Sequence, residues 1–260
     1  MERNQIPVLC RFLGLMALLL LLMAFAGCGR PAVKIHLGAE EIRVNGRIAG
    51  EEETNGVFVK NDIVYYEAGQ DLTYGEGSLQ DAHSQEEAGA HRVVHIGKPG
   101  TYRISGALSA GQIAVDLGEE AKTDPEAVVT LILDGVNISC QVAPAVLFYN
   151  VYECGPADEE TAPQQVDTAK AGANVIIADG SENHISGSYV ARIYEPGTAV
   201  LNEEGTAVED AKKLHKYDGA FYSKMSMNVN GQRKGTGKLY IQGENEGLDS
   251  ELHLDRKSVV

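Results

Sequence analysis

Three acidic side chains in the last part of the chain, Asp218, Glu246 and Asp249, could together bind a metal ion. Ser223 and Ser250 are matching points of two similar phrases that lie 27 residues apart. If these phrases stack as neighbouring parallel strands, Asp218 and Glu246 begin successive layers and lie about 4.8 Å apart. Two carboxylates at that separation repel by about 3.5 kcal/mol at an effective dielectric constant of about 20. A calcium ion, which takes about six to eight oxygen ligands, would remove the repulsion. The sequence therefore predicts calcium at these acids; the alternative is that they point into water at exposed turns.

Aromatic and cationic side chains in the same half of the chain could recognise a sugar. Such recognition needs ring faces that stack on a pyranose and planar or charged donors that hold its hydroxyl or carboxylate groups. The candidates are Tyr189, Arg192, Tyr217, Tyr222 and Lys224. Strand alternation places Tyr222 and Lys224 on the same face, so an outward-facing pair is expected there. The alternative is that these rings pack against the protein itself.

The elements that must position these residues are short β-strands. Apolar residues alternate with period two, and Gly, Asp, Asn and Pro separate the runs. A repeat of 20 to 50 residues indicates stacked repeat units, so the two phrases should lie on top of one another in a parallel β-solenoid. Long helical periods are missing after residue 27, which disfavours a βαβ sheet. The predicted strands are Arg92–Ile96, Thr101–Leu108, Gln112–Leu117, Val128–Ile138, Ala145–Val151, Asn174–Ala178, Ala220–Asn230 and Lys238–Gln242.

Other stretches interrupt this series. Residues 28–89 form a strand-rich N-terminal segment and linker, in which Ile63–Tyr66 looks like a strand and residues 76–91 read as a loop. Gly155–Gly172 and Tyr194–Lys216 are polar insertions. Insertions in stacked repeats usually leave the stack as loops on one side, and binding tends to occur there.

The composition limits the partners and the compartment. The formal net charge of -15 argues against nucleic acid and against an anionic membrane surface, because both would be repelled. Residues 1–27 resemble a lipoprotein-type signal peptide, with an apolar run from Phe12 to Ala26 that ends at Cys28. Cys28 would then carry the lipid anchor, and the rest of the protein would lie outside the cell membrane. The alternatives are a plain signal peptide and a retained anchor helix. Each of these three hypotheses predicts that the domain is exported.

Export permits disulfides, which draws attention to the remaining cysteines. Cys140 and Cys154 are the only pair in the body of the chain. A disulfide between them would close a short loop and contribute about 3 kcal/mol in the chain-entropy model. The alternative, which the sequence favours equally, is that both cysteines are free thiols.

Several phrases between residues 90 and 254 together resemble a known family. They are GTYRISGALSAGQIAVDL, VTLILDGVNI, DGAFYSKMSMNVNG, GTGKLYIQG and NEGLDSELHL. The series resembles the bacterial carbohydrate-binding domain-containing family of clostridial cellulose- and acid-sugar-binding type. That resemblance implies a right-handed parallel β-helix similar to pectate lyases, polysaccharide as the partner, and calcium in the acidic turns. Residues 255–260 depart from the pattern, so we expect a truncated, atypical tail there.

The sequence favours an exported, lipid-anchored polysaccharide-binding protein for cellulose-like or acidic glycans. No catalytic residue is assigned, because Ser/His/Asp sets, nucleophile elbows and phosphate loops are all missing from the sequence. Two alternatives remain open. A calcium-dependent polysaccharide lyase would use Lys224 or Arg192 as base, and a surface adhesin or spacer would contact other proteins and bind no glycan.

Overall fold

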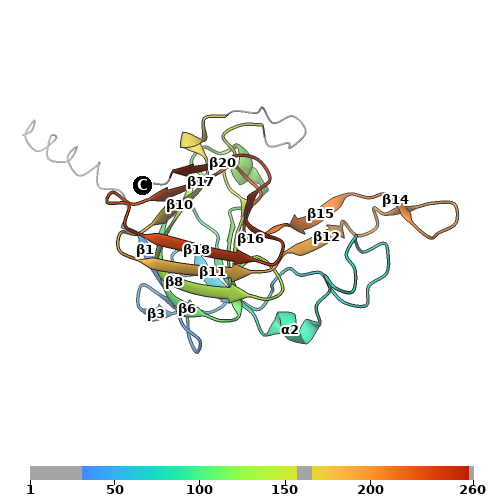
Figure 1. Cartoon of the computed structure of the whole chain (residues 1–260), viewed down its shortest axis with the longest axis horizontal. Helices are drawn as coiled ribbons and strands as arrows, with labels where there is room; N and C mark the ends of the chain where they lie inside the picture. The colour runs from blue at the N-terminus through green and yellow to red at the C-terminus, as the bar shows by residue number, and fades with distance from the viewer. Residues whose placement is uncertain (1–30, 157–165, 258–260) are drawn as a thin grey trace, which may run out of the picture. The chain divides into compact units, whose positions relative to one another are not determined.

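The computed structural model of this protein describes residues 31–156 and 166–257. Within these ranges the protein is all-β, and two sheets are built mainly from parallel strands (Figure 1). The larger sheet contains β1 (Val33–Leu37), β2 (Arg43–Val44), β3 (Arg47–Ile48), β6 (Gly100–Leu108), β8 (Val129–Cys140), β10 (Ala173–Ile177), β11 (Glu182–Gly187), β17 (Met227–Gly231), β18 (Lys238–Gly243) and β20 (Leu254–Lys257). The smaller sheet contains β4 (Val57–Lys60), β5 (Arg92–Ile96), β7 (Gly111–Asp116), β9 (Val146–Asn150), β16 (Gly219–Ser223) and β19 (Glu246–Ser250).

From β5 onward the chain passes back and forth between the two sheets. The smaller sheet has the order β19-β16-β9-β7-β5-β4, and the larger has the order β20-β17-β10-β8-β6-β1-β2-β3, with β11 between β8 and β18. Each pair of successive strands in the smaller sheet, from β5 to β19, is parallel. Parallel neighbours need a crossover connection, and here each connection contains one or more strands of the other sheet.

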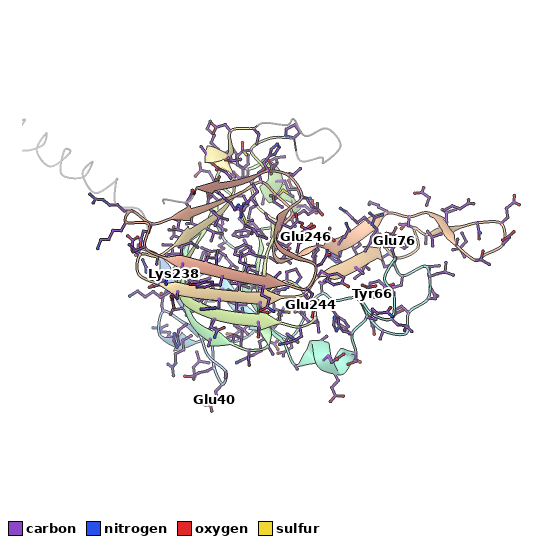
Figure 2. The ribbon with its side chains drawn as sticks, viewed as in Figure 1. Glu40, Tyr66, Glu76, Lys238, Glu244 and Glu246 are labelled. Atoms are coloured by element: carbon purple, nitrogen blue, oxygen red, sulfur yellow. The ribbon has the colours of Figure 1, made fainter. Side chains whose placement is uncertain are left out.

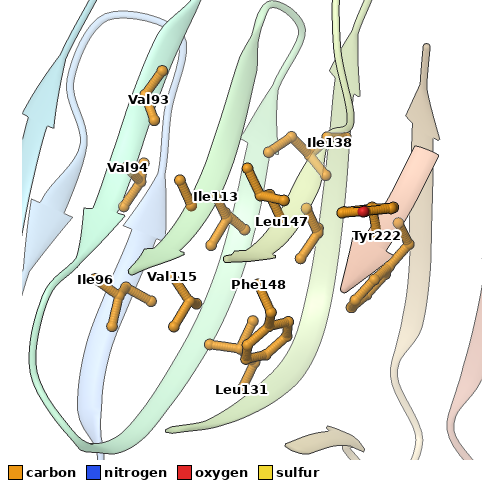
Figure 3. Packing of buried hydrophobic residues seen from close by; sticks show 14 of the residues in the cluster. Val93, Val94, Ile96, Ile113, Val115, Leu131, Ile138, Leu147, Phe148 and Tyr222 are labelled. Atoms are coloured by element: carbon orange, nitrogen blue, oxygen red, sulfur yellow. The ribbon is translucent and has the colours of Figure 1, made fainter. Parts of the chain in front are cut away.

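The core lies between the sheets, where residues at matching positions of neighbouring strands form columns. In the smaller sheet Ile96 pairs with Val115, which pairs with Phe148, which pairs with Ser223 and then Ser250. Figure 3 shows the first three of these side chains in sequence along the column. Ile96, Val115 and Phe148 are fully buried. This burial is the reason that the period-two pattern is kept from strand to strand.

The register predicted for the two matched phrases is confirmed. Ser223 lies opposite Ser250 in the parallel pair β16–β19, and Met227 lies opposite Leu254 in β17–β20. The two serine hydroxyls also donate to one acceptor, the carbonyl oxygen of Met225, at 2.6 and 3.0 Å. The repeat in the sequence is therefore a repeat of side-chain position, and the two serines share one hydrogen-bond acceptor.

One buried asparagine satisfies an irregular part of β8. The pairing of β6 with β8 shifts register near Gly135, which has φ of +79°, a conformation that glycine adopts without strain. The Oδ1 atom of Asn183 accepts hydrogen bonds from the backbone N–H groups of Gly135 and Val136, each at 3.0 Å. Asn183 is fully buried, and its Nδ2 donates to Ser181 and Lys238.

The predicted strands are found close to their expected bounds, with one division. The run Ala220–Asn230 is two strands, β16 and β17, because residues 224–226 turn from one sheet to the other. Two expectations were wrong. Ile63–Tyr66 is not a strand, and residues 76–91 contain the short helix α2 (Gln85–Gly89), whose capping box joins Ser84 and Glu87. Two short 3-10 helices are η1 (Glu119–Thr123) and η2 (Thr168–Lys170).

The insertion Tyr194–Lys216, which we expected as a loop, is mostly an antiparallel ribbon. Strands β12 (Val190–Tyr194) and β15 (Lys213–Tyr217) pair at its base, and β13 (Val200–Leu201) pairs with β14 (Val208–Asp210) beyond them. We call residues 190–217 the arm, which is seen clearly in Figure 1. We call residues 63–83, which run beside the arm, the side segment; Gly75 forms a β-bridge with Ile193.

The ends of the chain bear on three further expectations. Within the tail expected at residues 255–260, β20 continues the pairing with β17 as far as Lys257, and residues 258–260 lie outside the described residues. The predicted signal peptide and Cys28 lie outside the described residues. In the described part of the chain, no helix is both long and apolar enough to span a membrane.

Candidate functional site

A pocket of about 450 Å³ lies between the side segment and the arm. The two segments are joined by backbone hydrogen bonds from Tyr194 N–H to the Tyr74 carbonyl at 2.8 Å and from Glu76 N–H to the Arg192 carbonyl at 2.9 Å. The pocket is lined by Ile63, Val64, Tyr65, Glu67, Gln70, Asp71, Thr73, Tyr74, Ile193, Tyr194, Pro196, Gly197, Leu214 and His215. Three of these side chains are tyrosines, which offer both ring faces and hydroxyl groups to a ligand.

Tyrosine and glutamate side chains fix the wall of the pocket. The Tyr66 ring is buried and packs edge-on against Tyr74 at 5.1 Å between centroids, and its hydroxyl donates to the Gly77 carbonyl. Glu76 accepts hydrogen bonds from Arg192 and from the hydroxyl of Tyr194, each at 3.0 Å. Figure 2 labels Tyr66 and Glu76 at this junction. The two contacts of Glu76 join segments more than 100 residues apart in sequence.

A second group of side chains continues from the pocket onto the outer face of the smaller sheet. We call Tyr149, His215, Tyr217 and Lys224 the tyrosine cluster. The Nζ atom of Lys224 lies 4.6 Å from the centre of the Tyr149 ring. The Tyr149 ring lies 5.8 Å from that of His215 and 6.3 Å from that of Tyr217. His215 lines the pocket as well, so it belongs to both groups.

The charges around Lys224 are not balanced by a direct ion pair. Within residues 31–156 and 166–257, Lys224 forms no salt bridge, whereas Lys213 pairs with Glu251 and Lys122 pairs with Glu119. Burial, and then the ammonium of Lys122, lower the pKa of Lys224. Burial and the charge on Lys224 likewise lower the pKa of His215. A half-buried cation beside an aromatic ring is a suitable partner for a ligand carboxylate.

Two of the predicted sugar-binding tyrosines cannot stack on a ligand. The expected outward pair of Tyr222 and Lys224 is wrong for Tyr222, which is 1% exposed, and Tyr217 is 2% exposed. Tyr217 belongs to the arm and covers Tyr222, with 5.1 Å between the ring centres. The Tyr222 hydroxyl donates a hydrogen bond to Glu251, and burial raises the pKa of Tyr222. Both rings pack against the protein itself, as the alternative hypothesis predicts.

Tyr189 and Arg192 both contact the side segment. The Tyr189 hydroxyl donates to Asp81 of the side segment at 2.5 Å, and this hydrogen bond raises the pKa of Tyr189 to about 12. Arg192 pairs with Glu76 at 3.0 Å. Arg192 therefore ties the arm to the side segment, and Tyr189 does the same for the residue just before the arm. Of the five predicted residues, Lys224 is the partly exposed one in the tyrosine cluster.

The predicted calcium ligands lie near one another, but one was placed in the wrong register. Glu246 lies opposite Gly219, so Asp218 is one position removed from it, and Tyr222 lies opposite Asp249 as expected. Asp218 is paired with Lys216 at 2.7 Å. Burial, and then the charges of Glu246 and Asp218, raise the pKa of Asp249. Among the described residues no group of three or more His, Cys, Asp or Glu side chains is arranged to hold a metal ion.

Cys140 and Cys154 are free thiols in the structure. The sequence left open both a disulfide and two free thiols, and the structure has the free thiols. Cys140 is buried at the end of β8. Burial raises its pKa to about 11, which makes the thiol unreactive. Cys154 is half-buried and contacts the carboxylate of its neighbour Glu153 at 3.7 Å instead of a second sulfur.

Sequence reasoning missed Tyr65, Tyr74 and His215 as pocket residues. Tyr65 had been assigned to a strand, although three tyrosines within ten residues, at 65, 66 and 74, are a signal for an aromatic cluster. No comparable signal marks His215, because its role depends on the arm lying over the sheet. Only the three-dimensional arrangement joins it to Tyr149.

Comparisons with known proteins give the general class. Residues 90–155 match the family model described as carbohydrate-binding domain-containing protein. The chain is also similar to a carbohydrate-binding domain-containing protein of Acetivibrio thermocellus, with 28% identity over 241 residues that make up 92% of this chain and 60% of the relative. The chain thus spans about 60% of the length of that relative. No solved structure matches this chain.

Both comparisons agree with the coarser part of the resemblance, a carbohydrate-binding domain-containing protein, and they do not test the clostridial cellulose- and acid-sugar-binding type. The family match contains Tyr149 and Lys122, whereas the pocket-lining residues lie before and after it. The comparisons therefore do not locate a site in this chain. The location rests on the geometry of the pocket and the tyrosine cluster.

Proposed function

We propose that this protein binds polysaccharide, either cellulose-like or acidic and uronate-containing, in a groove formed by the pocket and the tyrosine cluster. The observation that carries the proposal is the tyrosine-lined pocket of about 450 Å³, which continues through His215 to Tyr149 and Lys224. Ligand pockets typically have volumes of roughly 300–1,000 Å³ and combine apolar rings with a few polar groups. Pyranose faces stack on such rings while hydroxyl groups bond to the polar side chains.

Lys224 supports the acidic part of this proposal. Its ammonium has no ion pair within the described residues, and two further lysines, Lys122 and Lys213, lie near it. A uronate carboxylate at this position would gain a charge-assisted hydrogen bond. A cellulose-like chain would rely on the rings alone, which makes the two glycan classes distinguishable by their salt dependence.

The test is binding of cello-oligosaccharide and oligogalacturonate to the protein, measured by calorimetry. Tyr65→Ala removes a ring from the pocket wall and should weaken binding about two- to tenfold, since aromatic contacts contribute about 0.5–1.5 kcal/mol. Tyr240→Ala is the matched control, because Tyr240 is 48% exposed on β18 and does not line the pocket. Equal losses in both variants would contradict the proposed location. Absence of binding to either glycan would favour the adhesin or spacer.

The scaffold in this proposal is a right-handed parallel β-helix. Support comes from the alternation of parallel strands between two sheets and from the 27-residue register of Ser223 and Ser250. An experimental structure in which the crossover connections are left-handed would contradict this part of the proposal.

Calcium at Asp218, Glu246 and Asp249 remains a proposal as well. It is supported by the raised pKa of Asp249, part of which comes from Glu246 and Asp218, because a cation would relieve that repulsion. A cation would also have to compete with Lys216 for Asp218. Replacing Asp218 and Asp249 by Asn should lower the melting temperature only in calcium-containing buffer. Equal melting shifts with and without a chelator would rule the site out.

Export and anchoring through Cys28 are supported by the sequence of residues 1–28. Incorporation of labelled fatty acid into the wild-type protein, and its loss in Cys28→Ala, would test the anchor. A protein that stays in the soluble fraction and carries no label would contradict it.

A lyase is the second candidate function, favoured by the lowered pKa of Lys224. The neutral amine of Lys224 would take the proton next to a uronate carboxylate, a C=C bond would form as the glycosidic C–O bond breaks, and the resulting ammonium would return the proton to the leaving oxygen. Unsaturated uronate products are detected by ultraviolet absorbance. Failure to detect them at high protein concentration would remove this candidate and leave the binding function untouched.

A further inference from the structure

The pocket and the tyrosine cluster differ in the sign of their charge. Two carboxylates, Glu67 and Asp71, line the pocket, and the described lining residues include neither lysine nor arginine. His215 is the one basic group in that lining, and its lowered pKa keeps it neutral at neutral pH. The cations Lys224 and Lys122 belong to the other end of the groove. A ligand in the pocket therefore faces negative charge.

The two carboxylates are not neutralised by neighbouring cations. Asp71 accepts hydrogen bonds from the backbone N–H and the hydroxyl of Thr73, at 2.8 and 2.6 Å, and these bonds lower its pKa. Glu67 accepts one hydrogen bond from Gln70 at 2.9 Å. Neither residue forms an ion pair in the described parts of the chain. Both remain able to accept hydrogen bonds from a ligand, since an ionised carboxylate has about four acceptor positions.

The rings beside these acids are placed to hold a sugar. Tyr65 and Tyr74 line the same pocket, and Glu67 contributes to the raised pKa of Tyr65, after burial. The Tyr74 hydroxyl donates to the Tyr65 carbonyl, which fixes the two residues relative to one another. The pocket thus combines aromatic faces with anionic acceptors and lacks a group that would balance their charge.

We propose that the pocket takes a sugar bearing a protonated amine, such as an unacetylated glucosamine unit of a polysaccharide. This inference rests on the proposed function and names the sugar that fills the pocket. The ammonium group supplies three hydrogen-bond donors and a positive charge to Glu67 and Asp71, while the ring packs against Tyr65 and Tyr74. A uronate unit in the pocket would meet repulsion, so acidic sugars are directed to the Lys224 end.

The test compares hexamers that share one β-1,4 backbone. Cellohexaose has a hydroxyl where the glucosamine hexamer has an ammonium group, and the N-acetylglucosamine hexamer has a neutral amide there. With the full chain, we expect the glucosamine hexamer to bind roughly three- to tenfold more tightly than the other two, because partly exposed ion pairs contribute about 0.2–1 kcal/mol each. Added salt should reduce this preference, because it screens exposed charges.

The decisive variants change charge without changing shape. The double variant Glu67→Gln and Asp71→Asn should bind the three hexamers equally, and Asn at position 71 can still accept from Thr73 N–H. Glu182→Gln, in an exposed pair with Lys238 on β11, is the control for the general attraction between an acidic protein and a cationic glycan. It should keep the preference of the wild type.

The outcomes separate the two proposals. If cellohexaose binds as tightly as the glucosamine hexamer, or if the double variant keeps the preference, the amine inference is wrong while glycan binding stands. If the wild type binds none of the hexamers, the proposed function itself fails.

Discussion

The stacked sheets and the arm with its side segment follow different rules. In the sheets, buried apolar residues lie opposite apolar residues of the neighbouring strand in columns such as that of Ile96, Val115 and Phe148. In the arm, residues 195–212 are all at least partly exposed, and long-range contacts such as Glu76 with Arg192 hold its base in place. The repeating sheets therefore provide the platform, whereas the arm and the side segment, which do not repeat, form the pocket.

The strongest test of this difference is removal of a core ring. Phe148→Ala should lower the free energy of unfolding by about 3–5 kcal/mol, because Phe148 is fully buried and its neighbours cannot fill the space. Leu214→Ala in the arm, where the side chain is 36% exposed, should cost less than about 1 kcal/mol. Chemical denaturation measures both values. Similar costs would contradict the division into platform and arm.

A second test uses asparagine in both regions. Asn183→Ala should cost about 1–3 kcal/mol, because it leaves the buried N–H groups of Gly135 and Val136 without an acceptor. Asn202 makes the same kind of contact in the arm, where its Oδ1 accepts from Thr206 and Ala207. Asn202→Ala should cost less, because water can replace the side chain there. A larger loss for Asn202→Ala in the same denaturation assay would reverse the comparison.

Shortening the arm should separate stability from binding. Tyr194 pairs with Lys213, so a two-residue Asn-Gly turn can replace residues 195–212 without disturbing β12 and β15. The free energy of unfolding should change by less than about 1 kcal/mol, because none of the removed residues is buried. Glycan binding should weaken, because Pro196 and Gly197 no longer line the pocket. Unchanged affinity together with an intact fold would place the binding site elsewhere.

The smallest expected effect is a pH dependence from His215, where the arm meets the sheet. Burial and Lys224 lower its pKa in the folded state, so the unfolded chain binds more protons between the two pKa values. The contribution of His215 is therefore fully present above about pH 6.5, the ordinary value for histidine, and is lost as the pH falls through the folded pKa. In His215→Gln the fall in stability on the acid side should be shallower. An unchanged acid-side slope would show that His215 does not carry it.

The sequence predicted the platform more fully than the site. Strands β5 to β10, β16 to β18 and the register of Ser223 with Ser250 follow from alternation and spacing, because one buried face imposes that pattern locally. The prediction of an outward Tyr222 followed the same alternation and was wrong. Alternation tells which residues leave the core, but it does not tell that Tyr217 of the arm then covers one of them.

An all-β chain with parallel strands follows from local sequence, because period-two burial and turn residues act over a few positions. The resemblance to carbohydrate-binding domain-containing proteins also follows from local phrases, and the comparisons agree with it. Three features depend on tertiary contacts: the side segment meets the arm, Tyr65 and Tyr74 share a pocket with His215, and Lys224 lies beside Tyr149. These contacts join segments far apart in the chain, and nothing in the local pattern of either segment specifies the other.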